Sequence, residues 1–312
     1  MELVRGLHNI SQRHAGCVLT VGNYDGVHLG HQQMIGILKA RAAEFDAKAT
    51  VLAFEPSSKE FIDPQGAPPR LTRWREKFLA LEDHGVDRLV TLRFDEHMRA
   101  MSPEGFVDEL LVAGLGTRHL VVGDDFRYGC NARGSIDTLR EAGRRLGFTV
   151  EQLPPYLVEG VRVSSTAVRA RLEEGDYSGA ARLLGRRYRM MGRVVHGNRL
   201  GRTLGFPTAN VRLMRRKSPV RGILAVWVLG VAETPLAAVA SLGTRPTVGG
   251  EEVLLEVHIF DYQGELYGKE IEVEFVAKLR DEIKFESLDD LVVQMKVDAE
   301  QAREVLSKVR SG

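Results

Sequence analysis

One stretch constrains the fold of this chain more than any other: the glycine-rich segment 22–31, with the sequence GNYDGVHLGH. It follows the apolar run 17–21, whose valine, leucine and threonine content is typical of a buried strand. It precedes residues 32–45, whose pattern predicts an amphipathic helix. A strand that ends in a glycine-rich turn and opens a helix presents backbone N–H groups and the positive end of a helix dipole, and both favour a phosphate ligand.

Two imidazoles, His28 and His31, lie in this turn with the spacing His-x-Gly-His. A tight turn whose histidines only pack or cap a helix would explain a single histidine. A pair at a strand-to-helix turn favours a functional site instead. We therefore expect His28 and His31 to act on a phosphate that is bound near Gly22, Asn23 and Gly30.

Length and composition narrow the class of protein. The chain has 312 residues, so two domains are the first expectation and one large α/β domain is the second. Lys and Arg number 43 against 42 for Asp and Glu, and this balance gives no general reason to expect nucleic-acid or membrane binding. Basic clusters at 186–189 and 212–221 could indicate nucleic-acid binding, but a solvated linker and a basic loop near a phosphate ligand explain them equally well. With the overall charge balanced and no interleaved platform of aromatic residues, nucleic-acid binding is the poorer interpretation. The two cysteines suit neither a disulfide framework nor a zinc site, and we expect a cytoplasmic protein without a secretion signal or a membrane span.

The first half of the chain alternates between short apolar runs and longer helical patterns. This alternation predicts a doubly wound parallel sheet, in an α/β fold whose ligands bind at the carboxyl ends of the strands. A second glycine-bounded segment, GDDFRYG at 123–129, also follows a strand end. The expected strands cover 17–21, 49–54, 88–92, 119–123 and 149–153, and the expected helices cover 32–45, 72–84, 103–113 and 135–146.

A helix start is predicted where Ser164, Ser165 and Thr166 precede residues 167–174, because their hydroxyls can accept bonds from free backbone N–H groups. Capping alone would explain the hydroxyls. Arg169 in the first turn is less expected, since the helix dipole disfavours a cation there unless an anion is present. The segment is therefore a second candidate phosphate site.

The character of the sequence changes near residue 185, where we place the boundary between domains 1–185 and 186–312. Short strand-like segments separated by turns then predict a small antiparallel β-barrel. Residues 287–309 carry apolar side chains at helical spacing and should pack on the barrel. The expected strands cover 188–195, 223–231, 237–242, 253–260 and 271–279.

Three polar residues of the second domain are candidates for chemistry. Thr208 and Asn210 end a glycine-rich loop and are oxygen donors of the kind that holds Mg²⁺ through a nucleotide phosphate, although a barrel turn with local hydrogen bonds explains them about equally well. Alternation along 253–259 separates Glu256 and His258 from four apolar residues. Glu256 is either a general base or an ordinary exposed strand residue, and spacing alone leaves both open.

Taken together, these segments resemble the bacterial bifunctional riboflavin kinase and FAD synthetase family over almost the whole chain. The His-x-Gly-His turn alone would indicate only the wider nucleotidyltransferase superfamily, but its combination with a Pro-Thr-Ala-Asn barrel is specific. The resemblance implies a nucleotidyltransferase-type sheet followed by a barrel. It rests on the motifs at 22–32, 123–129, 164–169, 207–210, 243–247, 279–282 and 285–288.

The resemblance implies that the barrel transfers the γ-phosphoryl group of ATP to riboflavin and gives FMN. Thr208 and Asn210 would hold Mg²⁺ and the nucleotide, Glu256 would accept the hydroxyl proton, and Arg280 would lie beside the flavin. A loop would cover the phosphates, and its residues are Gly192, His196, Gly197, Gly201 and Arg202.

For the amino-terminal domain, the resemblance implies that the FMN phosphate attacks the α-phosphorus of a second ATP, giving FAD and pyrophosphate. His28 and His31 would stabilise the developing charge. Two further sets would act with them: the triphosphate-binding residues Ser164, Ser165, Thr166 and Arg169, and the pocket residues Asp124, Asp125 and Phe126.

The substrates implied are small molecules (riboflavin, FMN and ATP), with no nucleic acid or membrane partner and the oligomeric state left open. Tyr24, Leu224 and the pair Ser57-Ser58 depart from the usual family pattern, which bears on the shape of the flavin pocket more than on chemistry. Two alternatives remain: only one site is active, or the chain is a non-catalytic flavin- or nucleotide-binding regulator.

Overall fold

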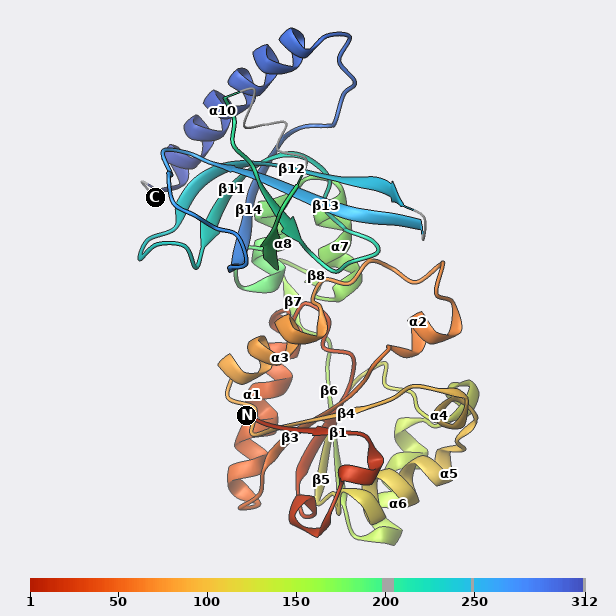
Figure 1. Cartoon of the computed structure of the whole chain (residues 1–312). Coiled ribbons are helices and arrows are strands. Elements are labelled where there is room, and N and C mark those ends of the chain that lie inside the picture. Colours follow the sequence, from red (N-terminus) through yellow and green to blue (C-terminus); the bar gives the residue numbers. More distant parts are fainter. Residues whose placement is uncertain (198–204, 248–249, 311–312) are drawn as a thin grey trace. The chain divides into compact units, whose positions relative to one another are not determined.

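The chain forms two compact units, each described here by itself (Figure 1). One unit comprises Met1–Pro68 and Trp74–Val163, and the other comprises Pro69–Arg73 and Ser164–Gly312. The boundary at residue 185 stays a prediction. The computed structural model describes residues 1–197, 205–247 and 250–310.

The first unit is built on a six-stranded parallel sheet in the order β1-β4-β3-β2-β5-β6. It confirms the doubly wound parallel sheet. Only the edge strand β1 was not predicted, because its four residues contain just two apolar side chains and pair with a single neighbour. The strands are β1 Glu2–Arg5, β2 Val18–Val21, β3 Ala49–Phe54, β4 Arg88–Leu92, β5 His119–Gly123 and β6 Thr149–Leu153.

Helices cover both faces of this sheet, and their bounds follow their caps. α1 begins at Leu29, earlier than the expected residue 32, because His28 serves as its N-cap. The helix expected over 103–113 is a short α-helix, α5, followed by the wider π-helix η3. The helices are α1 Leu29–Glu44, α2 Ser58–Ile62, α3 Trp74–Asp83, α4 Glu96–Ala100, α5 Pro103–Gly105, η3 Phe106–Gly114 and α6 Ile136–Leu146, with short 3₁₀ turns at Leu7–Asn9, Gln12–His14 and Cys130–Ala132.

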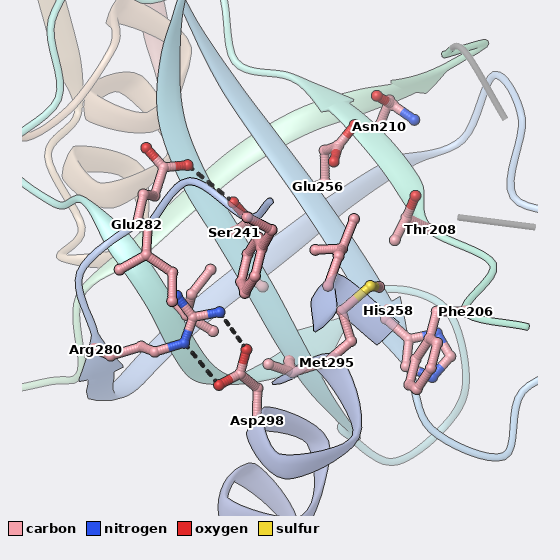
Figure 2. Close-up of a pocket in the computed structure, with 16 residues that line it drawn as sticks. Phe206, Thr208, Asn210, Ser241, Glu256, His258, Arg280, Glu282, Met295 and Asp298 are labelled. Carbon is pink, nitrogen blue, oxygen red and sulfur yellow. Dashed lines mark hydrogen bonds and ion pairs between the residues drawn. The ribbon is translucent and has the colours of Figure 1, made fainter. Parts of the chain in front are cut away.

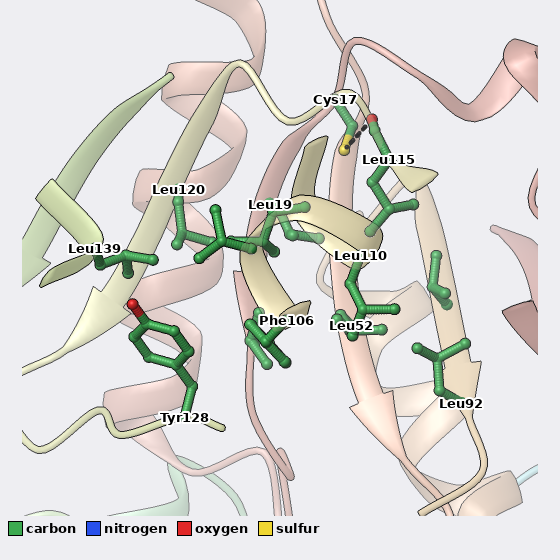
Figure 3. Close-up of a cluster of buried hydrophobic side chains, with 14 of the residues drawn as sticks. Cys17, Leu19, Leu52, Leu92, Phe106, Leu110, Leu115, Leu120, Tyr128 and Leu139 are labelled. Carbon is green, nitrogen blue, oxygen red and sulfur yellow. Dashed lines mark hydrogen bonds between the residues drawn. The ribbon is translucent and has the colours of Figure 1, made fainter. Parts of the chain in front are cut away.

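The sheet separates two hydrophobic cores, as alternation along a strand requires. Leu19 of β2 faces one core with Leu120, Leu110 and Phe106 (Figure 3). Val18, the preceding residue of the same strand, belongs to the other core. Because both faces of β2 are buried, this strand is a rigid support for the turn that follows it.

The carboxyl ends of β2 and β5 meet at the point where the strand order reverses. After β2 the chain adds β3 and β4 on one side, and it then returns to place β5 beside β2 and β6 beyond it. Ligands of doubly wound sheets bind in the crevice at such a switch point. The segments 22–31 and 123–129, which follow β2 and β5, therefore meet at the position where a ligand is expected.

The second unit is a closed antiparallel barrel in the order β10-β13-β12-β11-β14-β9. This confirms the predicted barrel. The four-residue strand β10 was not predicted, because the sequence PTAN at its start resembles a turn. The helices and strands of this unit are α7 Ser165–Glu173, α8 Tyr177–Leu184, β9 Arg189–Val195, β10 Ala209–Arg212, β11 Gly222–Leu229, β12 Leu236–Thr247, β13 Gly250–Ile259, β14 Glu270–Arg280 and α10 Leu288–Arg310. The first unit also contains a small hairpin, formed by β7 Leu157–Val158 and β8 Val161–Arg162.

The long helix α10 packs on the outside of the barrel, as predicted. Ala302 and Leu306 contact a cluster that includes Trp227 and Phe260. The amino-terminal half of α10 is free of this cluster and contributes to a cavity described below. Within the described parts of the chain, every helix is too short or too polar to cross a lipid bilayer.

The segment Pro69–Arg73 is bound to the barrel unit through its backbone carbonyls. The hydroxyl of Tyr188 and the guanidinium of Arg215 donate to the carbonyl of Leu71, at 2.9 and 3.2 Å. Arg215 is buried, so this residue of the basic cluster at 212–221 has a structural role. Arg187 and Arg189 pair with the buried Glu274, which likewise explains two residues of the other basic cluster.

Candidate active sites

In the first unit, the rings of His28 and His31 form a stacked pair at the start of α1. Their centroids are 3.6 Å apart with an interplanar angle of 15°. The Nδ1 atom of His28 accepts a bond of 3.3 Å from the backbone N–H of His31. A Cβ at Gly30 would lie 3.3 Å from that same Nδ1, so glycine allows the ring to lie close to the backbone. The turn thus presents two imidazoles at a helix amino terminus.

The charge of His31 is set by its surroundings. Burial lowers the pKa of His31 well below 6.5, and electrostatic interactions with His28 and Lys77 lower that pKa further. Its Nδ1 atom is buried and has no hydrogen-bond partner among the described residues. We infer that His31 is neutral at pH 7 and interacts with an anion as an N–H donor.

This gives a pH prediction. Unfolded chains bind the His31 proton near pH 6.5 and the folded chain binds it only at lower pH, so the free energy of unfolding should fall as the pH drops below about 6.5. An NMR titration should show no protonation of His31 between pH 8 and 6.5. In Lys77→Met the pKa of His31 should rise toward 6.5. A wild-type pKa of 6.5 or higher would contradict this account.

The turn between β2 and α1 is strained. Tyr24 and Val27, neither of them glycine, have φ angles of 49° and 42°. Such angles are uncommon for residues with side chains and concentrate at functional sites. Both residues are fully buried, and the Tyr24 hydroxyl is hydrogen-bonded to Thr20 Oγ1 at 2.7 Å and to Met34 Sδ at 3.0 Å. This packing holds the turn in place and gives the unusual tyrosine hydroxyl its partners.

The loop after β5 places Asp124, Asp125 and Phe126 beside the same crevice. Arg162, in β8, binds Asp124 with two bonds of 2.9 and 2.7 Å and lies 3.3 Å from Asp125. The Phe126 ring stacks on Tyr128, with centroids 5.9 Å apart. The loop therefore combines an apolar wall with an exposed cluster of charges, and Arg162 is a member that the sequence analysis missed.

The predicted triphosphate-binding segment lies at the start of α7. Ser164 is the N-cap, and its hydroxyl accepts a bond of 3.1 Å from the Ala167 N–H. Ser165 and Thr166 form the first turn, and the Nε of Arg169 donates to the Pro69 carbonyl at 2.6 Å. These residues belong to the second compact unit, whereas His28 and His31 belong to the first, so their joint action on one triphosphate stays a prediction.

In the barrel unit, one cavity of about 390 Å³ brings together Thr208, Asn210, Glu256 and Arg280 (Figure 2). For this unit, the family resemblance implies metal binding by Thr208 and Asn210, proton transfer by Glu256 and flavin contact by Arg280. Apolar side chains complete the lining, among them Ile223, Val239, Phe285, Leu291 and Met295. Thr208, Asn210 and Glu256 lie together and form what we call the polar end of the cavity, and Arg280 and Asp298 lie apart from them (Figure 2). Polar groups beside apolar side chains are typical of ligand pockets.

Strand register places Glu256 at the centre of the polar end. It lies directly opposite Asn210 of β10 on one side and Ser241 of β12 on the other. Its neighbours Leu255 and Val257 are fully buried inside the barrel. The predicted alternation is therefore confirmed, and Glu256 is on the face that lines the cavity.

The predicted phosphate loop is described only in part. A side chain at Gly197 would collide with the Asn210 amide, so Gly197 packs directly on a predicted magnesium ligand. The ring of His196 lies against that of Tyr267, with centroids 3.9 Å apart and planes tilted by 31°. Gly192 lies inside β9, where a Cβ would come within 2.6 Å of Val211, and close strand packing is enough to explain it. Two further members, Gly201 and Arg202, lie outside the described residues.

Family comparisons match both parts of the chain. A model described as FAD synthetase matches residues 10–167, and a model described as riboflavin kinase matches residues 184–306. A relative named bifunctional riboflavin kinase/FMN adenylyltransferase, from Haemophilus influenzae, is 44% identical over 97% of this chain and 98% of its own length. A relative of the same name from Escherichia coli K12 is 46% identical over 97% of each chain.

This chain belongs to the bifunctional riboflavin kinase/FMN adenylyltransferase family. A solved structure entitled macrolide-efflux protein, from Streptococcus pneumoniae, covers 97% of this chain and 99% of its own with a TM-score of 0.82 and 29% identity. An α/β domain followed by a barrel in one chain therefore occurs there as well.

In this family member, sequence reasoning missed several residues that line the barrel cavity. Glu282 accepts a bond of 3.2 Å from the Ser241 hydroxyl, and His258 Nδ1 lies 2.9 Å from the Pro207 carbonyl, next to Thr208. Asp298, on α10, binds Arg280. The signal for Asp298 was weak, since it lies 18 residues from Arg280 on a helix whose pattern suggested only packing.

Proposed function

We propose that this chain converts riboflavin to FAD in two ATP-dependent steps, one in each part. The barrel transfers the γ-phosphoryl group of ATP to the riboflavin 5′-hydroxyl and gives FMN. The amino-terminal domain transfers the adenylyl group of a second ATP to FMN and releases pyrophosphate. The observation that carries the proposal is the single cavity that holds Thr208, Asn210, Glu256 and Arg280.

The kinase step uses residues on one face of the barrel. We assign the Glu256 carboxylate as the acceptor of the riboflavin hydroxyl proton, because it lies in the polar end of the cavity between Asn210 and Ser241. Arg280 binds the flavin ring from the opposite wall. Phosphoryl transfer needs little else from the protein than positioning and charge stabilisation.

Magnesium fits the residues present. Thr208 offers a hydroxyl oxygen and Asn210 an amide oxygen, and Mg²⁺ commonly takes one or two protein oxygens together with nucleotide phosphates and water. Among the described residues, no group of three or more His, Cys, Asp or Glu side chains could hold a metal ion without such help. When bound, Mg²⁺ would neutralise charge on the transferred phosphate. Thr208 and Asn210 would orient the nucleotide through it.

We expect removal of Mg²⁺ by a chelator to stop FMN formation. Thr208→Val should raise the Mg²⁺ concentration for half-maximal kinase activity by about tenfold, which corresponds to loss of one ligand interaction. The measurement is FMN formation against free Mg²⁺ concentration. Thr234→Val, at an exposed turn outside the cavity, is the control and should leave that concentration unchanged. An unchanged value for Thr208→Val would remove Thr208 from the metal site.

The adenylyl-transfer step uses the switch-point crevice. His28 and the neutral His31 donate to the phosphate oxygens on which charge develops, and Gly30 lets the His28 ring lie close to the backbone. Gly22 and Asn23 belong to the same turn and are assigned to phosphate binding with them. Ser164, Ser165, Thr166 and Arg169 bind the triphosphate, and Asp124, Asp125 and Phe126 line the flavin pocket. This list of roles is supported by the helix N-caps at His28 and Ser164.

The two activities can be tested separately because each has its own flavin substrate. Riboflavin with ATP and Mg²⁺ reports on the barrel, and FMN with ATP and Mg²⁺ reports on the amino-terminal domain. Activity with only one flavin would support a chain with one active site, and tight flavin binding without turnover would support a regulator. We place the protein in the cytoplasm, where the unpaired Cys17 and Cys130 would remain reduced.

A further inference from the structure

Arg280 is held in the wall of the kinase cavity by a carboxylate of α10. Its Nε donates to Asp298 Oδ1 at 2.8 Å and its Nη2 donates to Asp298 Oδ2 at 2.6 Å (Figure 2). These two parallel bonds form the bidentate geometry that fixes both the position and the plane of a guanidinium. Arg280 therefore has one defined orientation before any ligand arrives.

Asp298 is itself fixed. Its side chain is buried, with the residue 3% exposed, and its Oδ1 also accepts a bond of 3.0 Å from Gln294 Nε2, one turn earlier on α10. A buried carboxylate persists only with a paired cation and further hydrogen bonds. Asp298 has both, and so the geometry of Arg280 is determined by the helix.

The same face of α10 is part of the cavity wall. Leu291, Met295 and Asp298 line the cavity at helical spacing, whereas Ala302 and Leu306, further along the helix, pack on the barrel core. Arg280 reaches this wall from the end of β14. The contact between Arg280 and Asp298 thus joins the end of β14 to the helix that supplies Leu291 and Met295 to the cavity wall.

Arg280 keeps donors for a ligand. A guanidinium has five N–H groups, and three are used by Asp298 and by the Asp281 carbonyl, which accepts from Nη1 at 2.9 Å. Each terminal nitrogen therefore retains one N–H without a partner among the described residues. The carbonyl oxygens of a flavin ring are suitable acceptors for these N–H groups.

We propose that Asp298 is a positioning residue for riboflavin: it holds Arg280 so that the remaining N–H groups meet the flavin ring. This inference rests on the proposed kinase function. A long arginine side chain that is ordered in advance loses little conformational freedom when the ligand binds. Asp298 acts on flavin binding rather than on phosphoryl transfer, because it contacts Arg280 and lies apart from the polar end of the cavity (Figure 2).

The test compares Asp298→Asn, Arg280→Gln and the double variant in steady-state phosphorylation of riboflavin. Asp298→Asn should raise the KM for riboflavin about tenfold, the loss expected for one well-placed hydrogen bond, with kcat changed less than about threefold. In the Arg280→Gln background, Asp298→Asn should add no further increase. FMN adenylylation by the same variants should be unchanged.

Asp261→Asn is the matched control. Asp261 also makes a bidentate pair with an arginine of α10, Arg303, at 2.8 and 3.0 Å, but it lies outside the cavity. This variant should keep the wild-type KM. If Asp298→Asn does not fold, as thermal unfolding would show, Gln294→Met replaces it, with a smaller increase in KM expected.

An unchanged KM in an active enzyme, or additive effects of Asp298→Asn and Arg280→Gln, would overturn the positioning role. Failure of the proposed function would be a different result, because wild-type protein would then form no FMN.

Discussion

Replacing His28 with asparagine is expected to reduce FAD formation from FMN by at least about a hundredfold and to leave FMN formation from riboflavin unchanged. In the proposed function the imidazole donates to the phosphate oxygens in the switch-point crevice, and loss of one such donor commonly costs a factor of 10² to 10³. Asparagine is a good N-cap, so α1 should keep its first turn. The measurement is the rate of each half-reaction with purified protein.

A comparison with His28→Ala separates chemistry from folding. Alanine removes the cap as well as the imidazole, and loss of a cap costs about 1 kcal/mol of stability. His28→Ala should therefore unfold at a lower temperature than His28→Asn and show a similar loss of FAD formation. Ser135→Ala removes the N-cap of α6, away from the crevice, and should lower stability without affecting either rate. Wild-type FAD formation by His28→Asn would refute the role of His28.

Replacing Glu256 with glutamine should lower the turnover of riboflavin phosphorylation by about a hundredfold or more. The amide keeps the size and the hydrogen-bonding position of the carboxylate but cannot accept the hydroxyl proton. FAD formation from FMN should remain at the wild-type rate. The measurement is kcat for FMN formation at saturating riboflavin and ATP.

The control for Glu256→Gln is Glu265→Gln, which removes the same charge from an exposed loop outside the cavity. It should keep the wild-type turnover. Nucleotide binding measured by calorimetry should be retained in Glu256→Gln, because Thr208 and Asn210 are intact. A Glu256→Gln variant with normal turnover would show that Glu256 is not the base.

Most strands of both units could be predicted from the pattern of apolar residues and turns in short segments of the sequence. Five strands of the parallel sheet and five of the barrel follow apolar runs whose length and flanking turns distinguish them from helices. The strands that were missed are short. β1 and β10 have four residues each and depend on pairing with distant neighbours, and the hairpin strands β7 and β8 have two residues each. Local pattern cannot show such pairing, because a short strand is stabilised mainly by its tertiary contacts.

The candidate residues divide in the same way. Thr208, Asn210 and Glu256 were found because a motif and a strand alternation mark them, and the barrel brings them into one cavity. Arg162 and Asp298 were missed because each acts through a partner 18 or more residues away, and the sequence holds no sign of that pairing.

The domain boundary at residue 185 stays a prediction, and the grouping of the helices before it is a separate observation. Composition changes near residue 185, but the helices α7 and α8 are grouped with the barrel in the second compact unit. Tyr177 of α8 stacks on Phe275 of β14, with ring centroids 6.5 Å apart. The pattern of two amphipathic helices does not reveal which core they face, so the sequence alone does not assign them to a compact unit.

The central claim is that two sites in one chain act in sequence. The most direct test follows riboflavin, FMN and FAD over time by chromatography after mixing riboflavin, ATP and Mg²⁺ with wild type, His28→Asn or Glu256→Gln. Wild type should form FMN first and then FAD, His28→Asn should accumulate FMN, and Glu256→Gln should leave riboflavin unconverted. Loss of both products in a folded His28→Asn variant, or FAD formation at the wild-type rate by Glu256→Gln, would contradict the account.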